Sequence, residues 1–470
     1  MRGTVRGGDA EAGRARAREL LEGRPAPGPP AGAGADAWLA FDQHVRWAAR
    51  WGRLPAGDRV ELLLCDPSGR IREAALAEPH APLELAAIRT ADWAEPERTR
   101  ARAVVDRALA TRPEATLRAL TPLAVRLGRR DQGGWILGRV EAALRGRPMG
   151  GAAVLQELLD GPDRRTRYFA ARLALSGPAP ADARTYARTC ARRAAAETDP
   201  ATARLWTDAA LAVLAADGPD DAAIDTLIGA VLPPVRAAGV TALRGAGRAT
   251  EGVRHLADSS GFVRACARWL VGRDGSDPRA HYRWLIADPA GPSPYAVTGL
   301  AECGGHEDVP LLRELLAHPV GRVRGAAVAG LRRLHAVVED AVLLALLDDA
   351  PSVAGEAARS LVPVVHRLDP AYLAERLGPR LPQATRQAAF RLLRARGGIH
   401  ELRACVALIE DWDPRTRKTA RATVRGWDWR PERVGGQEAR PELAALLRKA
   451  AGLFTEQELA RLRGVVEPRR

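Results

Sequence analysis

The sequence contains few lysines and few aromatic residues. Lysine occurs only at positions 418 and 449, so 69 of the 71 basic residues are arginine. This bias is typical of a GC-rich genome, and it weakens any inference of nucleic-acid binding from the number of arginines alone. Aromatic residues make up 4% of the chain. Because aromatic and β-branched residues dominate strands, this composition argues against a β-sandwich and favours helices packed through small side chains.

Cysteines are also few, and long apolar runs are missing. The five cysteines are widely spaced and form no C-x-x-C pair. Their odd number and apolar surroundings predict buried free thiols in a reducing compartment. No apolar run is long enough to cross a membrane, and residues 1–20 lack the apolar segment of a secretory signal. We therefore expect a cytoplasmic protein that does not contact a membrane.

The net charge of +14 favours anionic partners. Residues 98–147 carry 12 basic and 4 acidic side chains, a net charge of +8, and residues 411–470 carry 14 and 9, a net charge of +5. In the first zone, GRRDQGGW places Arg129 and Arg130 near Trp135. The arginines would then bind a phosphate backbone while the ring stacks on a base. A solvated basic helix face explains the same residues, and both interpretations stay open.

Residues 1–35 differ from the rest of the chain. The stretch RPAPGPPAGAGA at 24–35 is rich in Pro, Gly and Ala and cannot build a core. It predicts a flexible tail over 1–35, with a short Arg-rich helix at 11–22. Over 36–470 we expect a single helical array, with clear repeats at about 55–430 and an atypical cap at 431–470.

The chain repeats one unit, with steps of 28 to 32 residues in its second half. Each unit has a turn, then a helix that opens on a β-branched residue followed by arginine. In GRVRGAAVAGLRRL at 321–334, apolar residues at steps of four, four and three form one face. Two antiparallel helices fit one period, and each hides its apolar stripe only against neighbouring units. Taking Arg324 as the marker, the equivalent positions are Arg72, Arg98, Arg167, Arg204, Arg236, Arg264, Tyr295, Ala354, Arg386 and Arg417.

The units DPSGRIREAALAE, DSSGFVRACARWL, HPVGRVRGAAVAGL and DDAPSVAGEAARSL resemble HEAT repeats, most of all the short kind of the phycobilisome-lyase-like group. The resemblance implies an all-α fold, a right-handed α-solenoid of about twelve two-helix HEAT-like repeats whose second helices line a concave face. Related folds serve as protein scaffolds, bilin lyases, a di-iron hydroxylase and DNA glycosylases. The resemblance therefore specifies the fold and leaves the function open.

In four units an aspartate lies six residues before the marker arginine. We expect this aspartate to cap the second helix and the arginine to pair with the aspartate of its own or the next unit, as an internal ladder. Alternatively, the arginines bind phosphates or acidic side chains on the concave face. Arg324 and Arg386 are then the ligand candidates, because His318 and Arg380 replace the aspartate. The ladder pairs are Asp66 and Arg72, Asp92 and Arg98, Asp258 and Arg264, and Asp411 and Arg417.

Tryptophans accompany aspartates at three places. Trp93 and Trp412 follow the turn aspartate at the same repeat position, which predicts that both rings pack between neighbouring repeats. RGWDWR at 425–430 departs from that register, so Trp427 and Trp429 are binding candidates. Two His-Glu pairs, at 306–307 and 400–401, resemble those of the di-iron hydroxylase. Because no other metal-ligand spacing accompanies them, we expect no metal and no cofactor.

The leading functional hypothesis is a non-catalytic scaffold that binds an extended protein partner through its concave face. The alternative is a nucleic-acid-binding solenoid that uses residues 98–147 and the C-terminal end, with a DNA-repair-like activity on bases as one form. The sequence has no GxSxG, P-loop or Rossmann glycine pattern, so it indicates binding rather than catalysis.

Overall fold

The computed structural model describes residues 5–24, 33–55, 59–146, 150–177, 181–288 and 291–467. These residues form helices and turns and contain no strand, which confirms the predicted all-α fold. The chain divides into two compact units, residues 1–246 (unit 1) and 247–470 (unit 2). The single helical array expected over 36–470 stays a prediction. In both units each helix packs on its neighbours in the chain, as in an α-solenoid.

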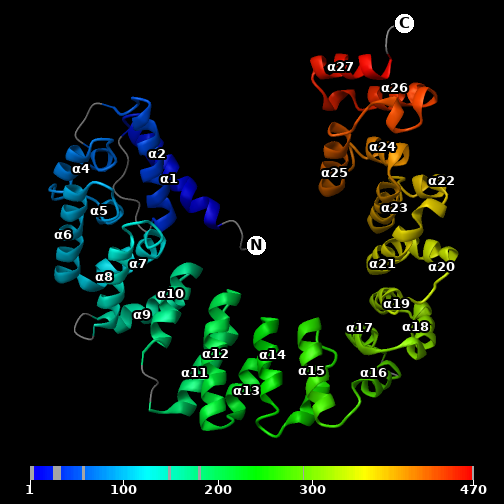
Figure 1. Cartoon of the computed structure of the whole chain (residues 1–470), viewed down its shortest axis with the longest axis horizontal. Helices are drawn as coiled ribbons and strands as arrows, with labels where there is room; N and C mark the ends of the chain where they lie inside the picture. The colour runs from blue at the N-terminus through cyan, green and yellow to red at the C-terminus, as the bar shows by residue number, and fades with distance from the viewer. Residues whose placement is uncertain are drawn as a thin grey trace. The chain divides into compact units, whose positions relative to one another are not determined.

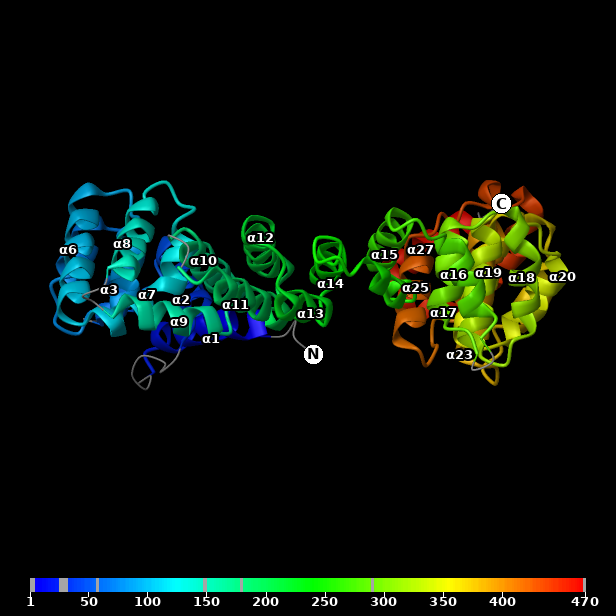
Figure 2. The ribbon, with the colours of Figure 1, turned by 90° about the horizontal axis from the view of Figure 1, so that it is seen from below.

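Unit 1 contains helices α1 to α14 (Figure 1). Alternate helices contact one another, so that α10 packs on α12 and α12 on α14; Figure 2 shows these three in succession. The bounds are α1 Val5–Leu21, α2 Ala35–Arg50, α3 Val60–Leu63, α4 Gly69–Ala75, α5 Leu83–Arg89, α6 Glu95–Thr111, α7 Pro113–Leu127, α8 Gly134–Arg145, α9 Gly151–Asp160, α10 Arg164–Leu175, α11 Ala183–Ala196, α12 Pro200–Asp217, α13 Asp221–Ile228 and α14 Pro233–Ala242.

Unit 2 contains α15 to α27 and several short 3-10 helices. Its alternate helices α17, α19, α21 and α23 contact one another in that order (Figure 1). The bounds are η2 Ala249–His255, α15 Gly261–Arg273, α16 Pro278–Ile286, α17 Pro294–Cys303, η3 His306–Asp308, α18 Val309–Glu314, η4 Leu315–Ala317, α19 Gly321–Arg333, α20 Asp340–Ala345, η5 Leu346–Asp348, α21 Pro351–Leu361, η6 Val362–Arg367, α22 Pro370–Glu375, α23 Gln383–Arg396, α24 Gly398–Ala407, α25 Pro414–Arg425, η7 Pro431–Arg433, η8 Gly436–Ala439, α26 Arg440–Lys449, η9 Ala451–Leu453 and α27 Glu456–Val466.

Helix α1 corrects the prediction of a flexible tail. It packs along α2, and Ala17 and Leu20 are only 0% and 1% exposed. Gly13 allows this close approach, because a Cβ there would lie 2.7 Å from the carbonyl carbon of Ala37. The Arg-rich helix predicted at 11–22 is present and begins at Val5, whereas the flexibility predicted around it is wrong for residues 5–21, because a few small apolar residues suffice to bury one face of an Arg-rich helix. The Pro/Gly-rich residues 25–32 lie outside the described part of the chain.

The second helix of each two-helix repeat begins at a recurring turn. The marker arginine lies four residues after the N-cap, as in α4, where Ser68 precedes Arg72, and in α19, where Val320 precedes Arg324. Two predicted markers do not fit. The N-cap of α12 is Asp199 and that of α17 is Ser293, so Ala203 and Val297 take the marker position in place of Arg204 and Tyr295.

Two kinds of aspartate stabilise these turns. N-cap aspartates accept a backbone N–H of the first turn, as Asp163 accepts that of Thr166 at 3.1 Å. The aspartate six residues before the marker, predicted as the cap, does something else. Asp258 accepts the N–H of Ser260 at 2.7 Å, which closes a turn before the helix starts. The same bond joins Asp66 to Ser68 at 2.7 Å and Asp411 to Asp413 at 2.8 Å.

Candidate anion-binding site

The marker arginine binds backbone carbonyls of its own turn. The Nη1 group of Arg72 donates to the carbonyls of Asp66 and Pro67 at 2.6 and 3.0 Å. Carbonyls near a helix end lack helical partners, so the guanidinium satisfies groups that burial would otherwise leave unpaired. The bond does not depend on the residue type six positions back. It recurs in Arg98, Arg167, Arg236, Arg264, Arg324 and Arg417.

In five repeats the same guanidinium also pairs with a carboxylate of the next repeat. Arg72 Nε donates to Glu97 at 2.7 Å, and the two side chains are 0% and 1% exposed. The ladder therefore joins these five arginines to the following repeat, whereas the residue six positions back contributes at most its backbone carbonyl. The other pairs are Arg167 with Glu197, Arg264 with Glu302, Arg324 with Asp349 and Arg386 with Asp411.

These contacts correct the proposal that Arg324 and Arg386 lack partners and are therefore ligand candidates. Arg324 donates to Asp349 at 2.8 Å and to the carbonyl of His318 at 2.6 Å. Arg386 is buried, forms an ion pair with Asp411 and donates to the carbonyl of Leu377 at 3.2 Å. The absence of an aspartate six residues back says nothing about pairing, because the acidic partner comes from the next unit.

The Arg324–Asp349 pair makes a prediction about pH. The hydrogen bond from Arg324 lowers the pKa of Asp349 below its ordinary value of 3.8, so its stabilisation is present above that value and is lost as pH falls through the folded-state pKa. The melting temperature of unit 2 should thus fall less steeply below about pH 4 in Asp349→Asn than in the wild type. Asp274→Asn, at an exposed position, is the control. Equal acid slopes in the wild type and Asp349→Asn would contradict the prediction.

The exposure of the tryptophans is almost the reverse of what the sequence predicted. Trp93 and Trp412, predicted to pack between repeats, are 77% and 58% exposed. Trp429, predicted to bind a partner, is 2% exposed and packs edge-on against Phe454 at 6.2 Å, so it belongs to the core of unit 2. Trp427 is half-buried. Trp135 is also half-buried, and the guanidinium of Arg102 lies 5.1 Å from its ring centre and covers one face.

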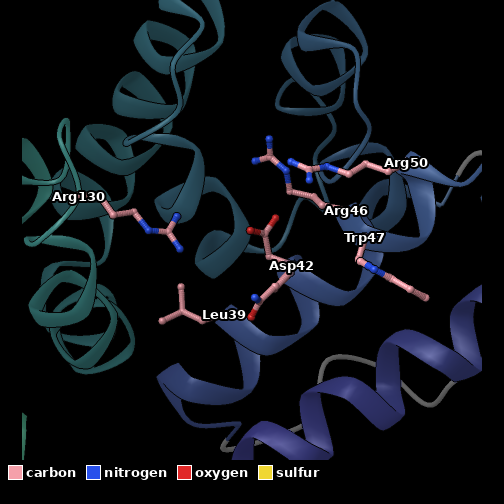
Figure 3. A pocket seen from close by; sticks show the side chains of 7 residues that line it. Leu39, Asp42, Arg46, Trp47, Arg50 and Arg130 are labelled. Atoms are coloured by element: carbon pink, nitrogen blue, oxygen red, sulfur yellow. The ribbon is translucent and has the colours of Figure 1, made fainter.

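A hollow of about 590 Å³ opens in unit 1 beside helix α2 (Figure 3). Asp42, Arg46 and Arg50 follow one another at steps of four and lie on one face of α2. Arg130, in the turn after α7, points into the hollow from the opposite side. Leu39, Gln43 and Trp47 complete the lining.

Beneath the hollow lies a network of buried charges. Arg89 is 0% exposed; it donates to Asp92 at 3.0 Å and forms an ion pair with Asp42. Asp92 also accepts from Arg72 at 3.1 Å, and Arg46 lies 3.5 Å from it. The surrounding arginines lower the pKa of Asp92 despite its burial. Asp42 and Asp92 are thus paired with the buried arginines and with Arg46, and they leave Arg50 and Arg130 at the rim without a paired carboxylate.

Arg50 and Arg130 are exposed and pair with no acidic side chain among the residues that the structure describes. Although the Arg130 side chain is open to solvent, partial desolvation by the surrounding atoms and repulsion from Arg46 lower its pKa. Like charges held together without an intervening anion are unfavourable, and such arrangements concentrate at binding sites. Of the candidates named from sequence, this hollow includes Arg130, whereas Arg129 and Trp135 do not line it.

A second hollow of about 1800 Å³ also borders α2, together with α7 and α9 to α12. Most of its arginines are paired with carboxylates. Arg126 pairs with Asp36 and Asp163 at 2.5 and 3.0 Å, and Arg118 pairs with Glu157 at 2.6 Å. The two hollows therefore differ in kind: the larger one is balanced in charge, and the smaller one carries excess positive charge.

Arg46 and Arg50 were not among the binding residues predicted from the sequence. Their signal was the spacing D-x-x-x-R-x-x-x-R at 42–50, which places three charges on one helix face. Nothing in the sequence indicated that Arg130, 80 residues after Arg50, faces them. That placement depends on the packing of α2 against α5 and α7.

No family model matches this chain, and no curated protein matches it either. Within the described residues, no group of three or more His, Cys, Asp and Glu is arranged to hold a metal ion. Glu307 and Glu401 of the two His-Glu pairs form ion pairs with Arg279 and Arg394. In the same part of the chain, every helix is too short or too polar to cross a bilayer.

Proposed function

We propose that this chain is a helical-repeat scaffold of HEAT-like type that binds an extended protein partner rather than transforming a substrate. The observation that carries the proposal is the exposure of tryptophan. Indole rings are usually more than half buried, and exposed ones are enriched among the residues that dominate protein–protein binding energy. Six of the eleven tryptophans are exposed: Trp47, Trp51, Trp93, Trp269, Trp284 and Trp412.

Two of these rings occupy equivalent places in different units. Trp93 and Trp412 both follow the turn aspartate, at the start of a second helix. Trp93 lies in unit 1 and Trp412 in unit 2, so each unit offers an exposed aromatic ring at the same repeat position, and such rings are typical of partner contacts. The repeat arginines are not needed for this role, because most of them are bound within the array.

The test is affinity capture from a lysate of the source cells, with the wild type and the double variant Trp93→Ala, Trp412→Ala. We expect one protein to be captured at near stoichiometric amount and lost in the double variant. Val337→Ala removes an exposed apolar side chain elsewhere and should retain it. A partner retained by the double variant, or no captured protein at all, would contradict the proposal.

Nucleic-acid binding is the second candidate. The observation in its favour is that Arg129 and Arg130 are exposed, with no acidic partner in the described segments. Treating the captured material with nuclease distinguishes the two candidates. Loss of the partner after nuclease treatment would favour nucleic acid, since phosphate contacts would then carry the association.

A further inference from the structure

We propose that the hollow beside α2 binds a phosphomonoester dianion, presented on a phosphorylated segment of the protein partner. This proposal rests on the proposed function, because it specifies the chemical group on the protein partner that this hollow would recognise. The carrying observation is the geometry of the rim: Arg46 and Arg50 on one side and Arg130 on the other point into one small hollow (Figure 3). Arginine forks bind phosphate oxygens in pairs, so two opposed guanidiniums can hold one phosphoryl group.

The charge of the cluster fits a dianion. The rim and the network beneath it hold five guanidiniums and three carboxylates, a difference of two positive charges. A phosphomonoester carries about −1.5 to −2 at neutral pH. One such group would neutralise the excess, whereas a single diester linkage would not. The cluster comprises Arg46, Arg50, Arg72, Arg89 and Arg130 with Asp42, Asp92 and Glu97.

Size and surroundings favour a single phosphorylated side chain over a nucleic-acid strand. A volume of about 590 Å³ is in the range of small-ligand pockets. A strand would need further unpaired cations to follow its backbone. Beyond Arg129, the neighbouring arginines of α7 do not supply them, because Arg118 pairs with Glu157 and Arg126 with Asp36 and Asp163.

The exposed ring of Trp47 gives the flanking residues of a peptide a place to pack. It lines the hollow and is 51% exposed. The guanidinium of Arg53 lies 5.8 Å from its centre, on the same stretch of chain. An aromatic surface beside an arginine cluster is a combination suited to phosphorylated peptide motifs.

Calorimetric titration of the full chain tests the proposal. The ligands are a phosphoserine peptide flanked by Ala and Gly, the same peptide without phosphate, and a short oligothymidylate with and without a 5′-phosphate. We expect the phosphopeptide to bind at low salt and the plain peptide not to bind. Arg130→Gln and Arg50→Gln should each weaken the phosphopeptide roughly tenfold or more, because each removes a charge-assisted contact. Neither residue has an acidic partner in the described structure, so melting temperatures should stay close to wild type.

Arg129→Gln is the matched control, because it makes the same change of charge at a neighbouring exposed arginine that does not line the hollow. It should change phosphopeptide affinity less than twofold. Equal weakening by Arg129→Gln and Arg130→Gln would overturn the proposal, as would no phosphopeptide binding or equal binding of both oligothymidylates. The titration needs no captured partner. A failure here therefore leaves the tryptophan-dependent capture standing, and a failure of capture alone leaves the phosphopeptide result standing.

Discussion

Replacing Arg72 by alanine should lower the melting temperature of unit 1 by roughly 10 °C. Arg72 is completely buried and bonds to Glu97, Asp92 and two backbone carbonyls. Asp92 would keep Arg89 and Arg46, but Glu97, 1% exposed, would keep no described partner. Stranding one member of a buried ion pair costs about 3–5 kcal/mol. In a unit of this size each kcal/mol lowers the melting temperature by about 2–4 °C.

Arg98→Ala is the control within the same unit. Arg98 donates to the carbonyls of Asp92 and Trp93 at 3.0 Å, as Arg72 does in its own turn, but it pairs with no acidic side chain in the described chain. Its loss should therefore cost about 1 kcal/mol, the typical value for hydrogen bonds without a stranded charge. Differential scanning calorimetry of the full chain measures both variants.

A second substitution shows how much of the stability lost in Arg72→Ala comes from the unpaired charge of Glu97 rather than from lost packing. Burial raises the pKa of Glu97, so its carboxylate is held ionised against desolvation chiefly by Arg72. In an Arg72→Ala background, Glu97→Gln removes that unpaired charge and should restore a substantial part of the lost stability. If Arg72→Ala and Arg98→Ala were equally destabilising, or if Glu97→Gln gave no recovery, the buried pair would not be the source of the effect.

The sequence predicted the helices and the repeat better than the bonds between repeats. The periodicity places most of the second helices, because it depends on contacts within a short stretch of chain, but the aspartate predicted as the cap lies in the turn before it. The spacing of Asp66 and Arg72 suggested a side-chain pair. In the structure Asp66 contributes its carbonyl, and the carboxylate comes from Glu97 in the next unit. A six-residue spacing cannot distinguish these cases, since either bond keeps the same two residues close.

The hollow beside α2 could be predicted only in part. The charges at 42, 46 and 50 share one face by helical geometry alone. Their environment depends on α5 and α7, where Arg89 neutralises Asp42 and Asp92 from below. From the sequence alone, Asp42 would be assigned to Arg46 as its ion-pair partner. The excess positive charge of the hollow would then be underestimated.

The exposure of the tryptophans was predicted least well. The reason is similar, because a sequence position does not show which way a side chain points. Trp93 and Trp412 occupy a regular repeat position, which suggested regular packing. That position lies in the turn just before the second helix begins, and the ring points to solvent there. The irregular RGWDWR segment instead places Trp429 in the core of unit 2, where its ring packs against Phe454.

Trp429→Ala should therefore destabilise unit 2 strongly. The ring is 2% exposed and packs against Phe454 with planes at 81°. Removing a buried aromatic side chain costs about 3–5 kcal/mol, the sum of lost transfer energy and a residual cavity. Trp412→Ala should cost about 1 kcal/mol or less, because that ring is 58% exposed and contributes little beyond its position 6.0 Å from the Arg386 guanidinium.

Trp429→Phe distinguishes packing from a polar role. The Nε1 group of Trp429 is buried and donates to no residue that the structure describes. Phenylalanine keeps an aromatic ring and removes this unpaired donor, so it should recover more than half of the stability lost in the alanine variant. Chemical denaturation followed by far-UV circular dichroism measures all three variants. Equal losses in Trp412→Ala and Trp429→Ala would contradict the assignment of Trp429 to the core, and would return it to the surface where the sequence pattern had placed it.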